Sequence, residues 1–215
     1  MANDKENNIL QLLPEPTLRR LPWYLAYVNL LATQSVEYVS STQISKAIHV
    51  DSSIIAKDLS FLNIRGKTRL GYEVKPLVVK LEEFLGFKKD HRAFIFGVGS
   101  LGGALVQDSG LSQFGLNIVA GFDVNPELVG SIKCGVPIYD ISELEQRQEQ
   151  FNAQIGIVAV PIEYAQEVTN LMVKVNIKAI WNFSPIRIIA EDDIVIQNTS
   201  IYAHLAVLYN RMNNK

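Results

Sequence analysis

FIFGVGSLGGAL, residues 94–105, decides the fold, because it has the pattern of a buried strand, a glycine turn and the beginning of a helix. Gly97 permits the tight turn, Gly99 lets the backbone approach a pyrophosphate, and Gly102 lets the helix pack closely against the strand. The helix N-terminus offers free N–H groups and the positive end of its dipole to phosphates. The stretch therefore predicts a dinucleotide-binding turn. Its predicted cofactor contacts are Gly97, Val98, Gly99, Ser100, Leu101 and Gly102.

An acidic residue follows this turn at the expected distance. Asp123 ends the mainly apolar stretch 117–122 and lies 21 residues after Gly102. At the end of a second strand, its carboxylate would accept hydrogen bonds from the adenosine ribose and repel a 2′-phosphate, which favours NAD over NADP. An ordinary strand-to-helix turn is the alternative interpretation of the glycines, and Asp123 counts against it. Val124, next to Asp123, is a further predicted contact.

The composition is that of a soluble globular protein, since 48% of the 215 residues are hydrophobic and 20% are charged. That length can hold one large domain or two modest ones. No apolar run is long enough to span a bilayer, and the polar start lacks the apolar segment of a signal peptide, so we expect a cytoplasmic protein. The single cysteine, Cys134, excludes an internal disulfide and a cysteine-based zinc cluster.

The N-terminal part has the pattern of a helix-turn-helix module. Two short helices are predicted on either side of a turn at residues 49–51, which is the helix-turn-helix spacing. Ser41 or Thr42 would cap the second helix of the module, and Asp51 or Ser52 would cap the third. The predicted ranges are 23–33 for the first helix, 43–48 for the second and 76–85 for the fourth.

The third helix of this module has a core face and a polar face. Ile55, Leu59 and Leu62 recur at i, i+4 and i+7 and would face the core. The opposite side carries small residues and one lysine, which suits entry into a DNA major groove. The residues predicted on that side are Ser52, Ser53, Ala56, Lys57 and Ser60, and all of them except Ala56 are predicted DNA contacts.

Residues 65–74 have the pattern of a wing, since two short extended pieces surround glycines and three positive charges fall within five positions. The basic tip of such a β-hairpin could reach phosphates or the minor groove. Arg65, Lys67 and Arg69 are therefore predicted DNA contacts, together with Arg19 ahead of the first helix. The alternative is a three-helix dimerisation or docking module with a solvated basic loop.

The pattern changes at a charged junction, residues 86–92, where we place the domain boundary. Beyond it, apolar β-branched runs alternate with helical stretches, which specifies a doubly wound parallel sheet with helices on both faces, a Rossmann-like α/β fold. Strands are predicted at residues 136–139, 155–160, 177–181 and 194–196, and helices at 141–151, 163–175 and 199–212. The predicted domains are residues 1–90, 91–198 and 199–215.

The ends of two later strands carry further candidate contacts, because the ligand of a doubly wound sheet lies beyond the carboxyl ends of its strands. Val160 and Pro161 follow one strand and could pass along a ribose. Asn182, Phe183 and Ser184 follow another, and they offer an amide, an aromatic face and a hydroxyl to a nicotinamide. The alternative for this second group is a proline-terminated turn with Phe183 packed inside.

A dehydrogenase would also need a general acid or base near the nicotinamide. His49 lies in the helix-turn-helix turn, His91 in the junction and His204 in the last helix. Lys174 and Lys178 flank the helix before a strand, at the wrong end of the sheet. The sequence has no metal-spaced cluster and no nucleophile elbow. We therefore expect no catalytic residues, no metal and no enzyme.

Together these segments resemble the Rex family of bacterial redox-sensing transcriptional repressors over nearly the whole chain. The segments that carry the resemblance are Arg20-Leu21-Pro22, Lys57-Asp58-Leu59-Ser60, Gly71-Tyr72, residues 97–102, Phe122-Asp123-Val124-Asn125-Pro126, Val160-Pro161 and Asn182-Phe183-Ser184-Pro185. The resemblance implies a homodimer of winged-helix and Rossmann domains whose terminal helices, residues 199–212 here, exchange between subunits. It also implies that NADH binding releases operator DNA, while NAD⁺ permits repression.

The chain departs from the family pattern at a few positions. Ala56 stands where many members carry an arginine in the recognition helix, and Asp108 stands where some carry a tyrosine thought to take part in the NADH switch. Ser200-Ile201 stands where those members have Asp-Phe in the exchanged helix. Two alternatives from other classes stay open at this point: an NAD-dependent oxidoreductase whose N-terminal helices serve dimerisation, and a coenzyme A binding module.

Overall fold

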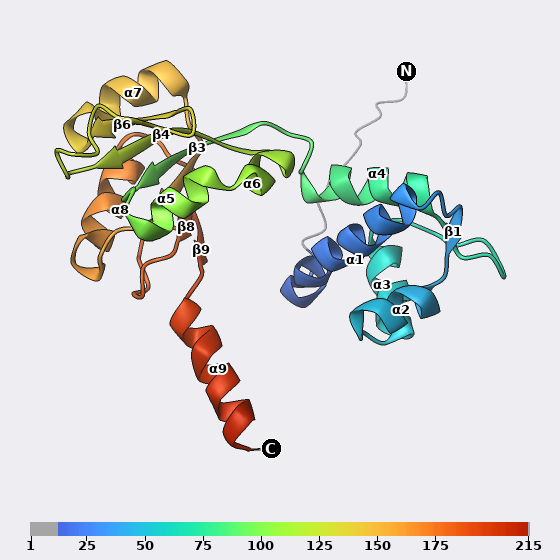
Figure 1. Ribbon diagram of the computed structural model, residues 1–215. Coiled ribbons are helices and arrows are strands. Elements are labelled where there is room, and N and C mark those ends of the chain that lie inside the picture. The colour runs from blue at the N-terminus through green and yellow to red at the C-terminus, as the bar shows by residue number, and fades with distance from the viewer. Residues whose placement is uncertain (1–12, 215) are drawn as a thin grey trace, which may run out of the picture. The chain divides into compact units, whose positions relative to one another are not determined.

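The computed structural model describes residues 13–214, and the chain divides into two compact units between Lys88 and Lys89 (Figure 1). The boundary predicted after residue 90 falls close to this division. The polar start of the sequence, residues 1–12, lies outside the described residues.

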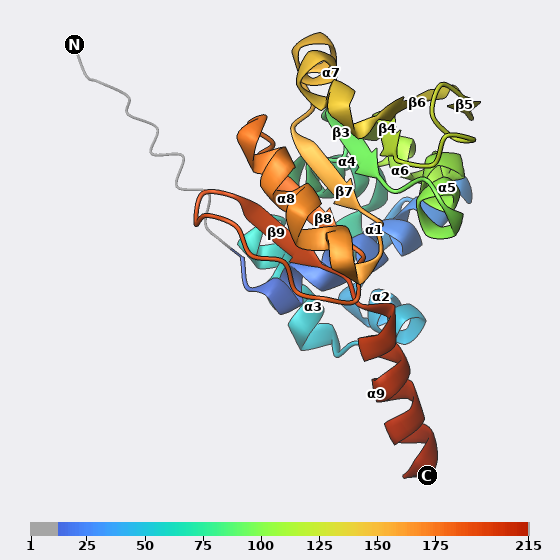
Figure 2. The ribbon, with the colours of Figure 1, turned by 90° about the vertical axis from the view of Figure 1, so that its left-hand side faces the viewer.

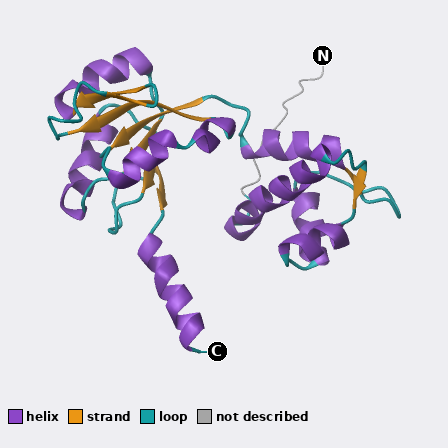
Figure 3. Ribbon diagram, viewed as in Figure 1, coloured by secondary structure: helices purple, strands orange, loops and turns teal. Residues whose placement is uncertain are grey.

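The N-terminal unit combines four helices with a two-stranded sheet (Figure 3). The strands pair antiparallel, with Tyr38 opposite Glu73 and Val39 opposite Tyr72. All four helices contribute buried side chains to one apolar core. The elements are α1 (Glu15–Thr33), β1 (Tyr38–Val39), α2 (Ser41–Ile48), α3 (Ser52–Phe61), β2 (Tyr72–Glu73) and α4 (Val74–Leu85).

Helix α1 begins at Glu15 rather than at Trp23, so its predicted start is wrong. Pro16 is tolerated in the first turn, where helix N–H groups lack an intrahelical partner in any case. Pro22 removes one hydrogen bond from the helix interior, but the buried face of α1 offsets that loss, because packing supplies most helix stability in proteins. The buried residues of α1 are Thr17, Leu21, Tyr24, Leu25 and Val28.

Side chains cap the next two helices. Ser40 caps α2 in a capping box, in which its Oγ accepts the Gln43 N–H at 3.1 Å and the Gln43 side chain accepts the Ser40 N–H at 2.8 Å. The predicted caps Ser41 and Thr42 are wrong, because the box needs its partner three residues after the cap. Asp51, one of the two predicted caps of α3, caps that helix through a backbone N–H at 2.7 Å.

A buried carboxylate holds α3 against α1. Asp58 is 1% exposed and accepts hydrogen bonds from three side chains of α1. The donors are Thr17 Oγ1 at 2.8 Å, Tyr24 OH at 2.6 Å and the Arg20 guanidinium at 2.7 and 2.9 Å. Burial by itself would raise the pKa of Asp58, but these hydrogen bonds together lower it below its ordinary value. The charged network therefore fixes α3 on α1.

The C-terminal unit is a seven-stranded sheet with helices on both faces. Its first half contains β3 (His91–Phe96), α5 (Ser100–Gln107), α6 (Ser109–Gln113), β4 (Leu116–Asp123), β5 (Ile132–Lys133), β6 (Val136–Asp140), η1 (Ile141–Glu143) and α7 (Leu144–Phe151). Its second half contains β7 (Ile155–Val158), η2 (Ile162–Tyr164), α8 (Ala165–Lys174), β8 (Ala179–Asn182), β9 (Val195–Asn198) and α9 (Ile201–Asn213).

The strand order is β5-β6-β4-β3-β7-β8-β9, with every pair parallel except β5 with β6. Strand β3 is central: the chain first adds β4 and β6 on one side, and then adds β7, β8 and β9 on the other. The order therefore reverses between β3 and β7, which is where a doubly wound sheet opens a crevice for a ligand.

Strand β3 supplies side chains to the cores on both faces of this sheet. Phe94 and Phe96 pack in the cluster that contains Leu144 of α7 and Met172 of α8. Ile95 packs in the other cluster, with Val98 of the glycine turn and Val106 of α5. Successive residues of a strand point to opposite faces, so one apolar run fills two cores.

Helix α9 leaves the sheet after β9 and extends away from it (Figures 1 and 2). Its large apolar side chains have few neighbours within the chain. Among the exposed ones are Ile201, Tyr202, Val207, Leu208, Tyr209 and Met212. Across residues 13–214, no helix is both long enough and apolar enough to cross a membrane.

Replacing the buried carboxylate should weaken the N-terminal unit. We expect Asp58→Asn to lower its free energy of unfolding by about 2–4 kcal/mol at pH 7, because Arg20 loses its charged partner. Tyr24→Phe, which removes a single hydrogen bond, should cost about 1 kcal/mol. Urea unfolding measures both changes.

The pH dependence of stability tests the same network. Because the pKa of Asp58 is lowered by folding, its contribution is complete above the ordinary aspartate value, about 4, and is lost as the pH falls through the folded value. The Asp58→Asn variant should therefore lose less stability than the wild type on acidification. Equal acid sensitivity of the two proteins would contradict the assignment.

Candidate functional site

The glycine turn joins β3 to α5, and the fold itself requires two of its glycines. Gly97 has a φ of 85°, and a Cβ on it would lie 2.7 Å from the carbonyl oxygen of Ala159. A Cβ on Gly102 would lie 1.9 Å from the carbonyl oxygen of Gly97. Side chains cannot occupy such positions, so these glycines permit the turn and the close packing of α5.

Gly99 differs from the other two, although it stands in the same turn. Its φ is −67° and its ψ is −148°, and no atom lies within 4 Å of the position that a Cβ would take. Steric contact within the protein therefore does not require glycine at this position, although its ψ lies outside the range usual for other residues. Gly99 is also the N-cap of α5, and no side chain caps that helix. Its first N–H groups are available to an anion, and Gly99 keeps the approach to them open.

The carboxylate of Asp123 is held beside the turn. Its Oδ2 accepts the Val98 N–H at 2.7 Å, and its Oδ1 accepts the Asn125 N–H at 2.9 Å. Each oxygen keeps a further lone pair for a ribose hydroxyl. Lys133 Nζ donates to the carbonyl oxygen of Val98 at 3.1 Å, a contact that the sequence did not indicate. Val124 is 76% exposed next to the carboxylate.

The backbone that follows β7 passes next to the same turn. The Ala159 N–H donates to the carbonyl oxygen of Phe96 at 2.8 Å. A Cβ on Gly97 would lie 3.0 Å from Cγ1 of Val160. The structure thus brings Val160 to the turn, and Pro161 follows it as the N-cap of η2.

Asn182 and Ser184 use their polar groups within the protein. Asn182 is buried, and its Nδ2 donates to the Ile186 carbonyl oxygen at 2.7 Å and to Asn198 Oδ1 at 2.9 Å. Its Oδ1 accepts the N–H and the hydroxyl of Ser184 at 2.9 and 2.8 Å. These two residues therefore build the loop after β8.

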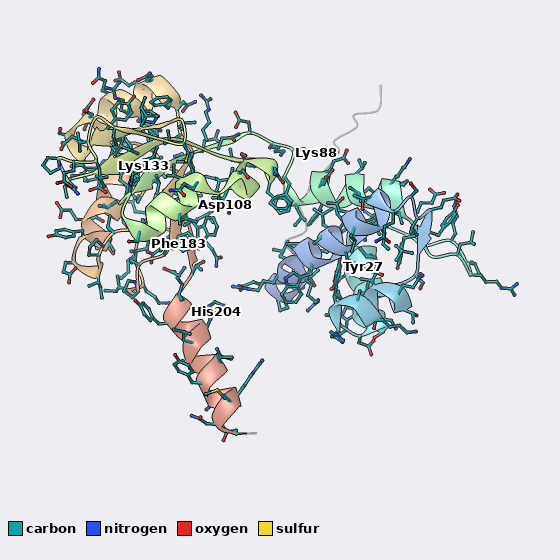
Figure 4. The ribbon with its side chains drawn as sticks, in the orientation of Figure 1. Tyr27, Lys88, Asp108, Lys133, Phe183 and His204 are labelled. Atoms are coloured by element: carbon teal, nitrogen blue, oxygen red, sulfur yellow. The ribbon has the colours of Figure 1, made fainter. Side chains whose placement is uncertain are left out.

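Phe183 lies between them and is half-buried (Figure 4). Its N–H donates to the Val158 carbonyl oxygen at 2.9 Å, which sets it at the carboxyl end of β7. Its ring centroid lies 4.5 Å from that of Trp181. Trp181 Nε1 in turn donates to Thr199 Oγ1 at 2.9 Å, just before α9 begins. The loop is therefore tied to the root of α9.

In the N-terminal unit, the polar side of α3 faces solvent. Ile55 and Leu59 are fully buried and Leu62 packs against the same core, as predicted. Ser60 Oγ donates to the Lys57 carbonyl oxygen at 2.7 Å, within the helix. Of the predicted DNA contacts on α3, Ser53, Lys57 and Ser60 are exposed and Ser52 is half-buried.

The wing is a hairpin closed by one antiparallel bridge, between Lys67 and Gly71. Their backbone hydrogen bonds measure 2.7 and 2.9 Å. Gly71 has a φ of 92°, and a Cβ on it would lie 2.4 Å from the carbonyl oxygen of Val39. Glycine at this position therefore allows the wing to pack closely against β1. Arg65 and Arg69 are exposed on either side of the bridge.

Two of the predicted DNA-contacting cations are paired with carboxylates. Arg19 Nη2 lies 2.6 Å from Glu15 Oε1 on the exposed side of α1. Lys67 Nζ contacts the Glu73 carboxylate and donates to Tyr38 OH at 3.1 Å. Within residues 13–214, the predicted cations that form no ion pair are Lys57, Arg65 and Arg69.

Two family models match parts of the chain. One is described as a CoA binding domain and matches residues 88–186. The other is described as "Putative DNA-binding protein N-terminus" and matches residues 13–60, which include α1, α2 and most of α3.

Curated relatives match the whole chain. A protein of Bacteroides fragilis is 57% identical over 213 residues, which cover 99% of this chain and 97% of that protein. A protein of Bacteroides thetaiotaomicron is 60% identical over 201 residues, or 94% of this chain and 91% of that protein. Both are named redox-sensing transcriptional repressor Rex.

Solved structures also match over nearly the whole chain. The crystal structure of RSP in complex with β-NAD⁺ and operator DNA has a TM-score of 0.89 at 32% identity, over 94% of each chain. RSP in complex with β-NADH has a TM-score of 0.85, over 94% of this chain and 95% of that one. RSP is a Rex-family repressor, and the likeness confirms the predicted winged-helix and Rossmann-like folds. The chain therefore belongs to the Rex family of redox-sensing transcriptional repressors.

Proposed function

We propose that this chain is a homodimeric cytoplasmic repressor that binds operator DNA and leaves it when NADH occupies the glycine turn. The observation that carries the ligand is Gly99, since no protein atom occupies the space that a Cβ would take there, whereas a pyrophosphate at the start of α5 needs that space. The names of the curated relatives support this function. The RSP structures with β-NAD⁺ and operator DNA, and with β-NADH, support the two partners.

The cofactor contacts follow from the geometry of the turn. The pyrophosphate would lie on residues 97–102 and the adenosine ribose on Asp123. Phe183 follows β8, and its N–H binds the last residue of β7; its ring would face the nicotinamide. Asn182 and Ser184 would act by holding the loop of Phe183 rather than by touching the cofactor. The remaining proposed contacts are Val124, Val160 and Pro161.

The CoA binding domain match raises a second candidate ligand for the same turn. Coenzyme A carries a 3′-phosphate on its adenosine ribose, and the fixed Asp123 carboxylate would repel that charge. NAD(H) presents two neutral hydroxyls there, so the carboxylate favours it. Competition between NADH and CoA compounds separates the two ligands.

We propose no catalytic activity. His91 begins β3, at the amino end of the sheet, and His204 lies on α9. His49 ends α2, in the other unit. A general acid or base must reach the reacting carbon, and none of these histidines belongs to the segments that surround the turn. The names of the relatives, which are repressors, agree with this proposal.

The DNA contacts would come from α3 and the wing. Lys57 is the exposed cation on the polar side of α3, with Ser52, Ser53 and Ser60 around it. Arg65 and Arg69 are the unpaired cations of the wing, and Arg19 lies on α1. Small polar side chains on a helix and cations on a hairpin suit groove and phosphate contacts.

Release of DNA needs a ligand that binds two arrangements of the dimer unequally. Oxidised nicotinamide carries a positive charge and reduced nicotinamide does not. The aromatic ring of Phe183 could therefore distinguish the two forms, because the face of a ring attracts a cation. Trp181 ties the loop of Phe183 to Thr199 at the root of α9. We propose that α9 exchanges between subunits, because its apolar side chains are exposed in the single chain.

Gly99→Ala tests the ligand site. We expect its free energy of unfolding to fall by only about 1 kcal/mol, because the Cβ meets no atom and the cost comes from the ψ of −148° alone. NADH affinity should fall about tenfold or more, ~1.4 kcal/mol, measured by calorimetry. Gly102→Ala is the matched control and should lose about 1–3 kcal/mol of stability. Undiminished NADH binding by Gly99→Ala would exclude a pyrophosphate at this position.

A gel shift on DNA from upstream of the chain's own gene tests the function as a whole. We expect NADH, titrated into the complex, to release the DNA, and NAD⁺ to leave it bound. The Gly99→Ala variant should bind the DNA and need about ten times more NADH, or more, for its release. A complex that persists in saturating NADH would refute the redox-sensing part, even if DNA binding holds.

Leu208→Glu tests the exchanged helix. Leu208 is 58% exposed in the single chain, so a charge there should leave the fold of the protomer intact. If α9 packs on a partner, the buried charge should shift the sedimentation coefficient from dimer toward monomer at micromolar concentration. Asn214→Glu, at an exposed residue just after α9, adds the same single negative charge and is the control for the change of charge. A Leu208→Glu dimer as stable as the wild type would exclude the exchange.

A further inference from the structure

The three cations of the wing differ in their surroundings. Arg65, Lys67 and Arg69 alternate along the chain, and by sequence each is an equal candidate for a phosphate. In the folded unit only Lys67 has a carboxylate partner among the described residues. That partner, Glu73, belongs to β2, so the pair runs from the wing to the strand that follows it.

Lys67 is held by several contacts at once. Its Nζ contacts the Glu73 carboxylate, donates to Tyr38 OH at 3.1 Å, and lies 5.3 Å from the centroid of the Tyr38 ring. Tyr38 OH itself donates to Glu73 Oε1 at 3.1 Å. Tyr38 and Glu73 are cross-strand partners in β1 and β2. The backbone of Lys67 closes the bridge with Gly71. The side chain of Lys67 thus ties the wing to both strands, while its backbone closes the wing itself.

The electrostatics of this cluster keep Lys67 in place. The hydrogen bonds that Lys67 donates to the Glu73 carboxylate and to Tyr38 OH raise the pKa of Lys67, and the same contact with Lys67 lowers the pKa of Glu73. Both groups are therefore charged at neutral pH, and the pair is neutral as a whole. If Lys67 moved to a DNA phosphate, the Glu73 carboxylate would be left unpaired beside a polyanion.

The cluster is half-exposed, with 55% of the Lys67 side chain and 40% of the Glu73 side chain in contact with solvent. Exposed ion pairs contribute little to the stability of a fold. The fold of the unit depends instead on its apolar core and on the buried Asp58 network. What the cluster can determine is the direction of a hairpin that a single backbone bridge closes.

We propose that Lys67 is a positioning residue, which with Glu73 and Tyr38 fixes the direction of the wing, and that the phosphate contacts of the wing come from Arg65 and Arg69. This inference rests on the proposed DNA-binding function. It replaces the sequence-based assignment of Lys67 as a direct DNA contact. Glu73 becomes a residue that limits how strongly the wing is attracted to DNA.

The salt dependence of DNA binding separates a phosphate contact from a positioning residue. Each phosphate neutralised contributes about 0.9 to the slope of log affinity against log salt concentration. The probe is one duplex from upstream of the chain's own gene. We expect Arg69→Gln to lower the slope by about 0.9 for each wing on the DNA. Lys67→Met should keep the wild-type slope and lower the affinity several-fold at every salt concentration.

Glu73→Gln is the converse variant. It removes the carboxylate and frees Lys67, so we expect the slope to rise by about 0.9 per wing and the affinity at low salt to increase. The double variant Lys67→Met, Glu73→Gln should return to the wild-type slope. The substituted side chains are exposed or, for Glu73, partly exposed, so unchanged thermal unfolding is the check on their fold.

The outcomes are distinct. A drop in slope for Lys67→Met equal to that for Arg69→Gln would overturn the proposal, because Lys67 would then be a phosphate contact. An unchanged slope for Arg65→Gln and Arg69→Gln would also overturn it, since the wing would carry no phosphate. A wild-type chain that fails to bind the duplex at low salt would instead refute the proposed function.

Discussion

The close approach of α5 to the end of β3 is the constraint on which the C-terminal unit depends. A Cβ on Gly102 would meet the carbonyl oxygen of Gly97 at 1.9 Å, so the start of the helix is seated directly on the central strand. This contact puts the uncapped N–H groups of α5 where the strand order reverses, between β3 and β7. Asp123 then fixes the turn through the Val98 N–H. The proposed cofactor site is therefore built mainly from backbone, and the side chains around it select among ligands.

This backbone origin explains which parts of the site could be predicted from the sequence. A glycine at a fixed spacing and an acid at a strand end both report local constraints, so residues 97–102 and Asp123 could be found without a structure. Polar side chains after a strand are different, because their partners are set by strand pairing. Asn182 reaches Asn198 only because β8 lies beside β9. Its sequence neighbours therefore could not show that its amide is already used.

The same limit applies to charges in the N-terminal unit. The spacing of cations along residues 65–69 predicted a wing, but the register of β1 and β2 decides that Glu73 neutralises Lys67. Asp58 lies 34 to 41 residues from its partners on α1, too far for a spacing argument. The start of α1 was missed for a related reason: Pro22 weakens the local pattern, whereas tertiary packing of the helix face decides the outcome. Local signals thus predicted the elements, and long-range contacts determined the roles of their side chains.

Internal ion pairs involve some of the cations that were predicted to contact DNA. Of those predicted cations, Lys57, Arg65 and Arg69 form no ion pair within residues 13–214. With few phosphate contacts, the affinity for an operator depends on how well α3 and the wing fit their grooves. Both elements are fixed within one unit, α3 by the Asp58 network and the wing by the Lys67 cluster. A ligand that reorients such a unit displaces all its contacts together, so a coupling free energy of about 1–3 kcal/mol, typical of allostery, is enough to release DNA.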